Sequence, residues 1–158
     1  MSKLSVTAVP GKQEIILTRV FDAPRDLVFR TYTDPSTISE WWGPRSMSTT
    51  VDRMEVKKGG VWRFVQRGKD GTEHAHNGVY HEVTAPARLV NTYEYEGFPG
   101  SVGLVTTTFE DLPDGRTKLT EVTLYPSVEA RDGVLQSGMA EGAEELFDRL
   151  EALMASLR

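Results

Sequence analysis

Apolar and polar residues alternate through the middle of the chain, whereas helical spacing of apolar residues is confined to segments nearer its two ends. Residues 14–21 (EIILTRVF) are rich in β-branched side chains and predict a strand. Turn sequences containing glycine, proline or aspartate recur through residues 47–126 and delimit about six further strands. The intervals between these strands are too short for crossover helices. The pattern therefore predicts an antiparallel sheet of about six to seven strands.

Two short helices are predicted between the first strand and the rest of the sheet, near residues 24–33 and 36–42. Asp22 or a neighbouring residue should cap the first helix, and Pro24 suits its first turn. The Asp-Pro-Ser sequence at 34–36 ends this helix and begins the second. The two helices would therefore form a helix–loop–helix insertion after the first strand.

Trp41 and Trp42 place a large apolar area at the end of this insertion. They could fill a corner of the core, which is the simpler interpretation, or close the mouth of a cavity. Adjacent residues on a helix point in different directions. One tryptophan can therefore belong to the core while the other meets the cavity.

The segment from Ser127 onward has apolar residues at helical spacing, Leu146 and Leu150 among them, and predicts one long helix. Such a helix can cover the buried face of a curved sheet, so the fold class is α+β. A cavity easily remains between a helix and a strongly curved sheet. Gly138 and Gly142 would serve either close contact between helix and sheet or added cavity volume.

A hairpin fixes which side chains share a face of the sheet. The Lys-Asp-Gly turn at 69–71 predicts a three-residue loop that pairs Gly68 with Thr72. One face then has the larger aromatic rings, and we take it as concave; it carries Trp62, Phe64, Gln66, His74, His76, Gly78, Tyr80 and Glu82. Later strands give two further sets of residues that share a face, Leu89, Asn91, Tyr93 and Tyr95 in one and Val105, Thr107 and Phe109 in the other. An aromatic surface with a few polar groups is typical of a small-molecule pocket.

Composition narrows the functional classes. The chain has 158 residues and no cysteine, which excludes thiol catalysis and cysteine-bound zinc. Its net charge of -5 argues against a nucleic acid partner. No run approaches the ~20 apolar residues of a membrane span, and the N-terminus lacks the apolar core of a signal peptide. We expect a single cytoplasmic domain over residues 1–158, with residues 1–12 as a loose lead-in.

Polar residues on the predicted strands supply few candidates for chemistry. His74 and His76 would share a face, but spacing fixes no third ligand, so no metal site is predicted. His76 with Tyr80 and Glu82 could act as an acid–base group. Glu121 interrupts a β-branched strand; an outward, hydrated position is favoured, and an inward one would make it a site candidate. No nucleophile elbow or phosphate-binding glycine loop is present, and no cofactor is predicted.

Several short motifs occur in order along the chain: RVFDAP (19–24), TDP (33–35), WWGP (41–44), GGVWRF (59–64), TTFE (107–110), YPS (125–127) and DRL (148–150). With them the chain resembles the activator-of-heat-shock-protein-ATPase-like family of the START-related (SRPBCC) superfamily. The resemblance implies a helix-grip fold, in which a curved antiparallel sheet wraps around a long C-terminal helix. Many relatives carry a large residue at the position of Ala143, and the small residue here should leave more room under that helix.

The superfamily hosts lipid carriers, receptors, cyclases and co-chaperones, so the resemblance implies several functions. The favoured one is a soluble protein that binds a small, largely apolar ligand, a lipid or aromatic metabolite, between sheet and C-terminal helix. The alternatives are a co-chaperone-like interaction module with a chaperone partner, and an enzyme of the cyclase or dehydratase kind. A monomer or a homodimer would suit any of them.

The predicted cavity residues combine the aromatic side chains of the sheet with residues of the helices that cover it. Gln66, His76 and Glu82 would orient the polar end of a ligand. The catalytic alternative would use His76, Tyr80 or Glu82 to move protons. The full predicted cavity set is Phe29, Trp42, Trp62, Phe64, Gln66, His76, Tyr80, Tyr93, Tyr95, Phe109, Met139, Gly142 and Phe147.

Overall fold

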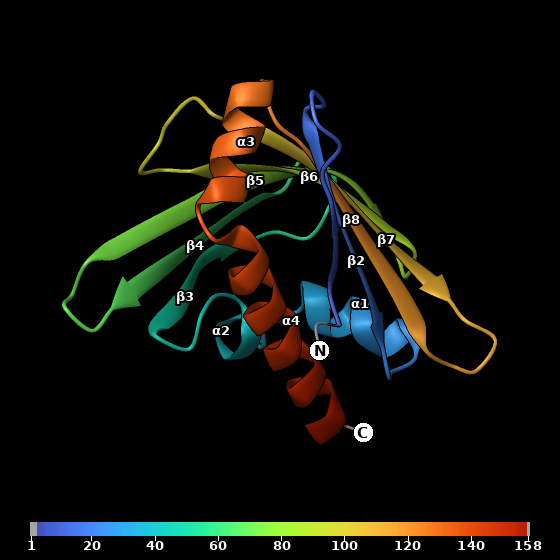
Figure 1. Ribbon diagram of the computed structural model, residues 1–158. Helices are drawn as coiled ribbons and strands as arrows, with labels where there is room; N and C mark the ends of the chain where they lie inside the picture. Colours follow the sequence, from blue (N-terminus) through green and yellow to red (C-terminus); the bar gives the residue numbers. More distant parts are fainter. Residues whose placement is uncertain (1–2, 158) are drawn as a thin grey trace.

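The computed structural model describes residues 3–157 as a curved antiparallel sheet with two helices across its concave face (Figure 1). The sheet has eight strands in the order β1-β2-β8-β7-β6-β5-β4-β3. Their bounds are Ser5–Thr7 (β1), Glu14–Phe21 (β2), Met47–Met54 (β3), Val61–Gly68 (β4), Glu73–Thr84 (β5), Arg88–Tyr95 (β6), Gly103–Asp111 (β7) and Thr117–Leu124 (β8). The predicted α+β class is confirmed.

The strand that the sequence pattern did not predict is β1. Val6 pairs with Leu17 of β2, and Leu4 is buried beside it. The prediction of a loose lead-in over residues 1–12 is therefore wrong for residues 5–7. A strand of three residues is too short to show an alternating pattern, so only its pairing reveals it.

The two predicted helices after β2 are confirmed as α1 (Arg25–Thr33) and α2 (Ile38–Trp41). The expected cap is wrong. Pro24 occupies the N-cap position of α1, and no side chain caps the helix there. The backbone N–H of Asp22 instead donates to Glu151 at 3.1 Å. Asp22 therefore helps to tie the entry of α1 to the C-terminal helix.

The C-terminal segment forms two helices rather than one, α3 (Val128–Gln136) and α4 (Met139–Ser156). Gly138 separates them with a φ of +85°, in the left-handed region that favours glycine. Gly142 lies on the exposed side of α4, and no atom lies within 4 Å of a Cβ placed there. Gly142 therefore gives neither close contact with the sheet nor cavity volume, and its assignment to the cavity is wrong.

One part of the core lies between β2, β7, β8, α1 and α4. The rings of Phe21 and Phe147 meet edge to face at 5.8 Å, and those of Phe29 and Phe109 do so at 5.1 Å. Phe29 and Phe109 thus pack against each other inside this core and do not line a cavity, contrary to the sequence-based prediction. Leu150 completes the layer with no exposed surface.

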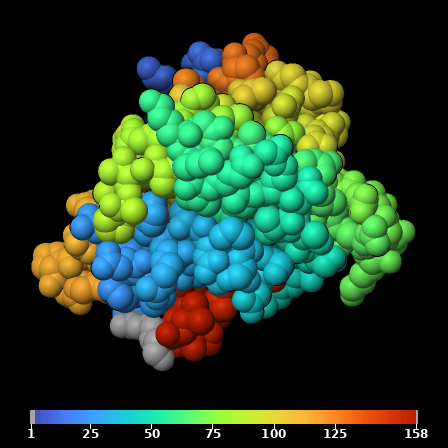
Figure 2. Space-filling view, turned by 180° about the vertical axis from the view of Figure 1, so that it is seen from behind, coloured from blue at the N-terminus to red at the C-terminus, as the bar shows by residue number. Residues whose placement is uncertain are grey.

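Charged contacts fix the C-terminal half of α4. The buried guanidinium of Arg19 on β2 lies 2.8 Å from Asp148 and 3.0 Å from Glu151. On the other side of the helix, Arg149 donates to the carbonyl of Gly43, after α2, at 2.7 Å. Seen from behind, the segment with α1 and α2 closes one end of the sheet, and the end of α4 emerges beyond it (Figure 2). This half of α4 is therefore anchored to both β2 and the α2 region.

The β4–β5 hairpin has the predicted register. The N–H of Gly68 donates to the carbonyl of Thr72 at 2.9 Å, and Phe64 lies opposite His76. The concave face of these two strands therefore carries the predicted aromatic and polar side chains as far as Tyr80.

Candidate functional site

A cavity of about 890 Å³ lies between the concave face of the sheet and helices α3 and α4. Strands β4 to β8 supply most of its floor, and α3 with the first half of α4 covers it. Ten of the residues predicted for a ligand cavity line it: Trp42, Trp62, Phe64, Gln66, His76, Tyr80, Tyr93, Tyr95, Met139 and Phe147. Whether they contact a ligand stays a prediction.

The two adjacent tryptophans have different surroundings. Trp41 is 1% exposed and packs on Tyr32 at 5.1 Å between ring centroids. Trp42 meets the rings of Phe64 at 5.1 Å and His76 at 5.0 Å. Both touch the cavity, but Trp41 is mainly a core residue and Trp42 packs against its polar wall.

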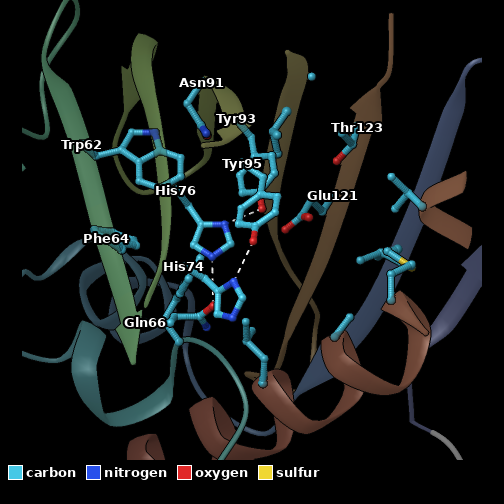
Figure 3. Close-up of a pocket in the computed structure, with 18 of the residues that line it drawn as sticks. Trp62, Phe64, Gln66, His74, His76, Asn91, Tyr93, Tyr95, Glu121 and Thr123 are labelled. Atoms are coloured by element: carbon cyan, nitrogen blue, oxygen red, sulfur yellow. Dashed lines mark hydrogen bonds between the residues drawn. The ribbon is translucent and has the colours of Figure 1, made fainter. Parts of the chain in front are cut away.

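A chain of three hydrogen-bonded side chains forms the polar part of this wall (Figure 3). His76 Nε2 lies 2.9 Å from Gln66 Oε1, and His76 Nδ1 lies 2.6 Å from the Tyr93 hydroxyl. Because a carbonyl oxygen only accepts, His76 carries its proton on Nε2 and its Nδ1 accepts from Tyr93. Burial, followed by the nearby His74, lowers the pKa of His76 to about 4, so the imidazole is neutral near neutral pH.

Both ring nitrogens of His76 are thus occupied within the protein. It would have to release Gln66 or Tyr93 before it could exchange a proton with a ligand, so the site supports a positioning role better than a catalytic one. Tyr80 also lines the cavity, and burial raises the pKa of its hydroxyl. It therefore stays protonated and can donate a hydrogen bond.

The second histidine has a separate partner. His74 Nδ1 lies 2.6 Å from the Tyr95 hydroxyl, next to the first chain of hydrogen bonds. Over residues 3–157, no group of three or more histidine, aspartate or glutamate side chains is placed to hold a metal ion. His74 and His76 therefore act with Tyr95 and Tyr93 as hydrogen-bonding groups of the wall.

Glu121 lies inside the cavity, not on the outer face that the sequence analysis favoured. Its Oε2 accepts a hydrogen bond of 3.0 Å from the Tyr32 hydroxyl of α1. Burial raises the pKa of Glu121, while the hydrogen bond from Tyr32 acts in the opposite direction. Figure 3 shows Glu121 directed inward from β8, apart from the Gln66 and His76 side chains.

Comparison of the sequence with protein families now places the chain. The family model described as "Activator of Hsp90 ATPase homolog 1-like protein" matches residues 22–155. The chain belongs to this family. The suspected family resemblance is therefore confirmed.

Solved structures similar to this family member agree on the fold. A protein from Rhodobacter sphaeroides is 28% identical with a TM-score of 0.90, and the match covers 98% of this chain and 99% of that one. Protein Ms6760 from Mycobacterium smegmatis is 28% identical with a TM-score of 0.81, covering 94% and 96%. A protein from Arthrobacter aurescens is 25% identical with a TM-score of 0.88, covering 98% and 93%. Comparison with curated proteins returned no match.

One residue predicted for the cavity, Glu82, lies elsewhere. A β-bulge between Tyr80 and Glu82 shifts the register of β5 against β6. Glu82 therefore leaves the concave face and bonds with Arg88 at 3.2 Å and Thr84 at 2.9 Å. The predictions that Glu82 orients a ligand or moves a proton in the cavity are wrong.

Other wall residues were missed by the sequence analysis. Tyr32 comes from α1, Tyr125 follows β8, and Leu146 faces the cavity from α4 beside Ala143. Leu146 had a signal, since it falls on the apolar stripe of the helix. Tyr32 and Tyr125 had no such signal in the sequence. The direction of an aromatic side chain at the end of a helix or strand depends on the assembled fold.

We place the opening of the cavity between the β6–β7 loop and α3, because residues there both line the cavity and are exposed. Phe98 in that loop lines the cavity and is also 68% exposed. Glu129 on α3 likewise lines the cavity and is exposed.

No helix within residues 3–157 is long and apolar enough to cross a membrane.

Proposed function

We propose that this chain binds a small, largely apolar molecule, a lipid or aromatic metabolite, in the cavity beneath α3 and α4. The observation that carries the proposal is a cavity of about 890 Å³ whose aromatic wall includes a buried polar chain of Gln66, His76 and Tyr93. Ligand sites typically combine such a volume with a few placed polar groups. A cytoplasmic location and a single domain are part of the same proposal.

The polar chain supports binding because it serves no evident need of packing. A core that only had to be stable would fill this volume with apolar side chains, since open space loses van der Waals contacts. Here Tyr93 donates to His76, yet its oxygen can still accept a hydrogen bond from a ligand. The wall can therefore orient the polar end of an otherwise apolar molecule.

The test is a ligand panel with a cavity-filling variant. Native mass spectrometry and thermal shift with lipids and aromatic metabolites should find at least one retained ligand. Ala143→Phe places a ring in the cavity and should lower the affinity for that ligand by at least about tenfold, equivalent to ~1.4 kcal/mol of binding free energy.

The matched control is Ala152→Phe, which adds the same ring on the exposed side of α4 and should bind as the unchanged protein does. Retention of no ligand across the panel would contradict the proposal. Equal binding by the Ala143→Phe and Ala152→Phe variants would also contradict it.

Family membership favours a second candidate function, interaction with a chaperone. Co-elution with a bacterial chaperone and stimulation of its ATPase would support it. An interaction that survives Ala143→Phe would be independent of the cavity. The absence of both co-elution and ATPase stimulation would eliminate this candidate.

A further inference from the structure

The cavity wall has acidic groups but no lysine or arginine. Of the described residues that line it, none is lysine or arginine, whereas Glu121 and Glu129 both belong to it. The chain has 18 lysines and arginines, so the absence reflects placement rather than composition. Of the arginines near the helices, Arg19 and Arg149 bind groups outside the cavity.

Glu121 is the acidic group set deepest among aromatic rings. Tyr32, which donates to its Oε2, packs at 5.1 Å on Trp41, and Tyr125 lies near enough for the Glu121 charge to affect its hydroxyl. Among the contacts of residues 3–157, no protein donor is assigned to Glu121 Oε1. A carboxyl group in such surroundings is unfavourable unless it is neutral or paired with a positive charge.

Neither histidine of the wall is bonded to Glu121, and His74 Nδ1 instead lies 2.6 Å from the Tyr95 hydroxyl. His76 is held neutral between Gln66 and Tyr93, with its acceptor nitrogen already used. A ligand carboxylate would therefore enter a cavity that has a carboxyl group and no lysine or arginine to pair with it. A ligand ammonium group would find both the free oxygen of Glu121 and aromatic rings, whose faces attract cations.

We propose that the ligand of this cavity is an apolar molecule carrying a protonated amine, which pairs with Glu121, and that the cavity rejects carboxylates. The inference rests on the proposed binding function and specifies its ligand class. The apolar part of the ligand lies against the aromatic wall, and the ammonium group donates to Glu121 Oε1. Glu129, exposed beside the opening, adds a second negative charge on the way in.

The experiment uses three probes that share one apolar skeleton: 4-phenylbutylamine, 4-phenylbutanol and 4-phenylbutyrate. Isothermal titration calorimetry near neutral pH should show the amine binding about tenfold more tightly than the alcohol, and the carboxylate more weakly than either. The alcohol shares the skeleton and a polar end but carries no charge, so the differences report the charge.

The decisive variant is Glu121→Gln, which keeps the shape and removes the charge. It should lower the affinity for the amine to that for the alcohol, while the unchanged alcohol affinity shows that the cavity is intact. The matched control is Glu110→Gln, which removes an exposed carboxylate of β7 outside the cavity and should retain the preference for the amine.

The outcomes separate this inference from the binding function beneath it. Binding of the alcohol with no preference for the amine, or a preference that survives Glu121→Gln, overturns the amine assignment only. Carboxylate binding as tight as amine binding does the same. Failure of all three probes, with a ligand retained from the panel described above, overturns the amine assignment only. Failure of the probes and of the whole panel overturns both the amine assignment and the binding function.

Discussion

The two halves of the interface between α4 and the sheet differ in how they use apolar residues. Along the C-terminal half, Leu150 and Met154 are at most 1% exposed, and Arg19 and Arg149 fix the helix on both sides. Along the first half, Met139, Ala143 and Leu146 face a cavity across from aromatic rings. Both halves are apolar, so apolarity does not distinguish a core from a binding site. The charged anchors show which half is built for stability.

The largest expected effect compares two leucines on α4. Leu150→Ala in the filled half should lower the free energy of unfolding by about 3–4 kcal/mol, because it creates a new void in a packed core. Leu146→Ala should cost only about 1 kcal/mol, because that side chain already faces open volume. Urea unfolding of both variants measures the difference. Equal losses would mean that the two halves are packed alike.

The anchor on β2 gives the next effect. Arg19→Met leaves Asp148 and Glu151 without their buried partner and should cost about 3 kcal/mol, the lower end for such pairs because both acids still reach water. Arg67→Met removes an exposed pair with Glu73 and should cost less than about 1 kcal/mol. The midpoints of thermal unfolding rank the two variants. A loss for Arg19→Met no larger than for Arg67→Met would show that the buried pair anchors nothing.

The region around the cavity should lose stability in acid, because His76 in its wall is buried in its neutral form. The folded pKa of His76 falls from 6.5 to about 4, so its neutral form contributes stability above pH 6.5 that is lost as the pH falls toward 4. The loss amounts to about 3 kcal/mol for a shift of this size. His76→Asn should lack this component, whereas His81→Asn, at an exposed position of β5, should retain it. Unfolding at several pH values tests this, and parallel profiles for all three proteins would refute it.

The smallest expected effect on stability compares Gly138, between α3 and α4, with Gly142, within α4. Gly138→Ala should cost about 1 kcal/mol, because its φ of +85° is unfavourable for alanine. Gly142→Ala should stabilise the protein by about 1 kcal/mol, since it lies within α4 with open space around it. Thermal unfolding gives both signs. A shared sign would mean that Gly138 does not hold the turn between α3 and α4.

The sequence predicts much of this fold because local rules decide it. The turn at 69–71 fixes the β4–β5 register, and alternation then places Phe64 and His76 on one face. The bulge after Tyr80 has no comparable signal, so Glu82 was placed on the wrong face.

Two other features depend on tertiary structure. The side chains of β8 alternate between two faces, one with Leu119 and Glu121 and the other with Val122 and Leu124. The two faces are similarly apolar, so alternation alone could not decide which one points inward. Leu119 is fully buried and Leu124 is 47% exposed, and this places Glu121 inside. The volume of the cavity likewise follows from how far the helices lie from the sheet, and no residue pattern encodes that distance.

The placement of the indole rings has a spectroscopic consequence. The chain has three tryptophans, and Trp41, Trp42 and Trp62 all line the cavity. The indole fluorescence of the protein therefore arises entirely from the wall of this one site. A bound molecule that displaces water or stacks on Trp42 should change the emission wavelength or intensity of the unlabelled protein, so the site contains its own optical reporter of occupancy.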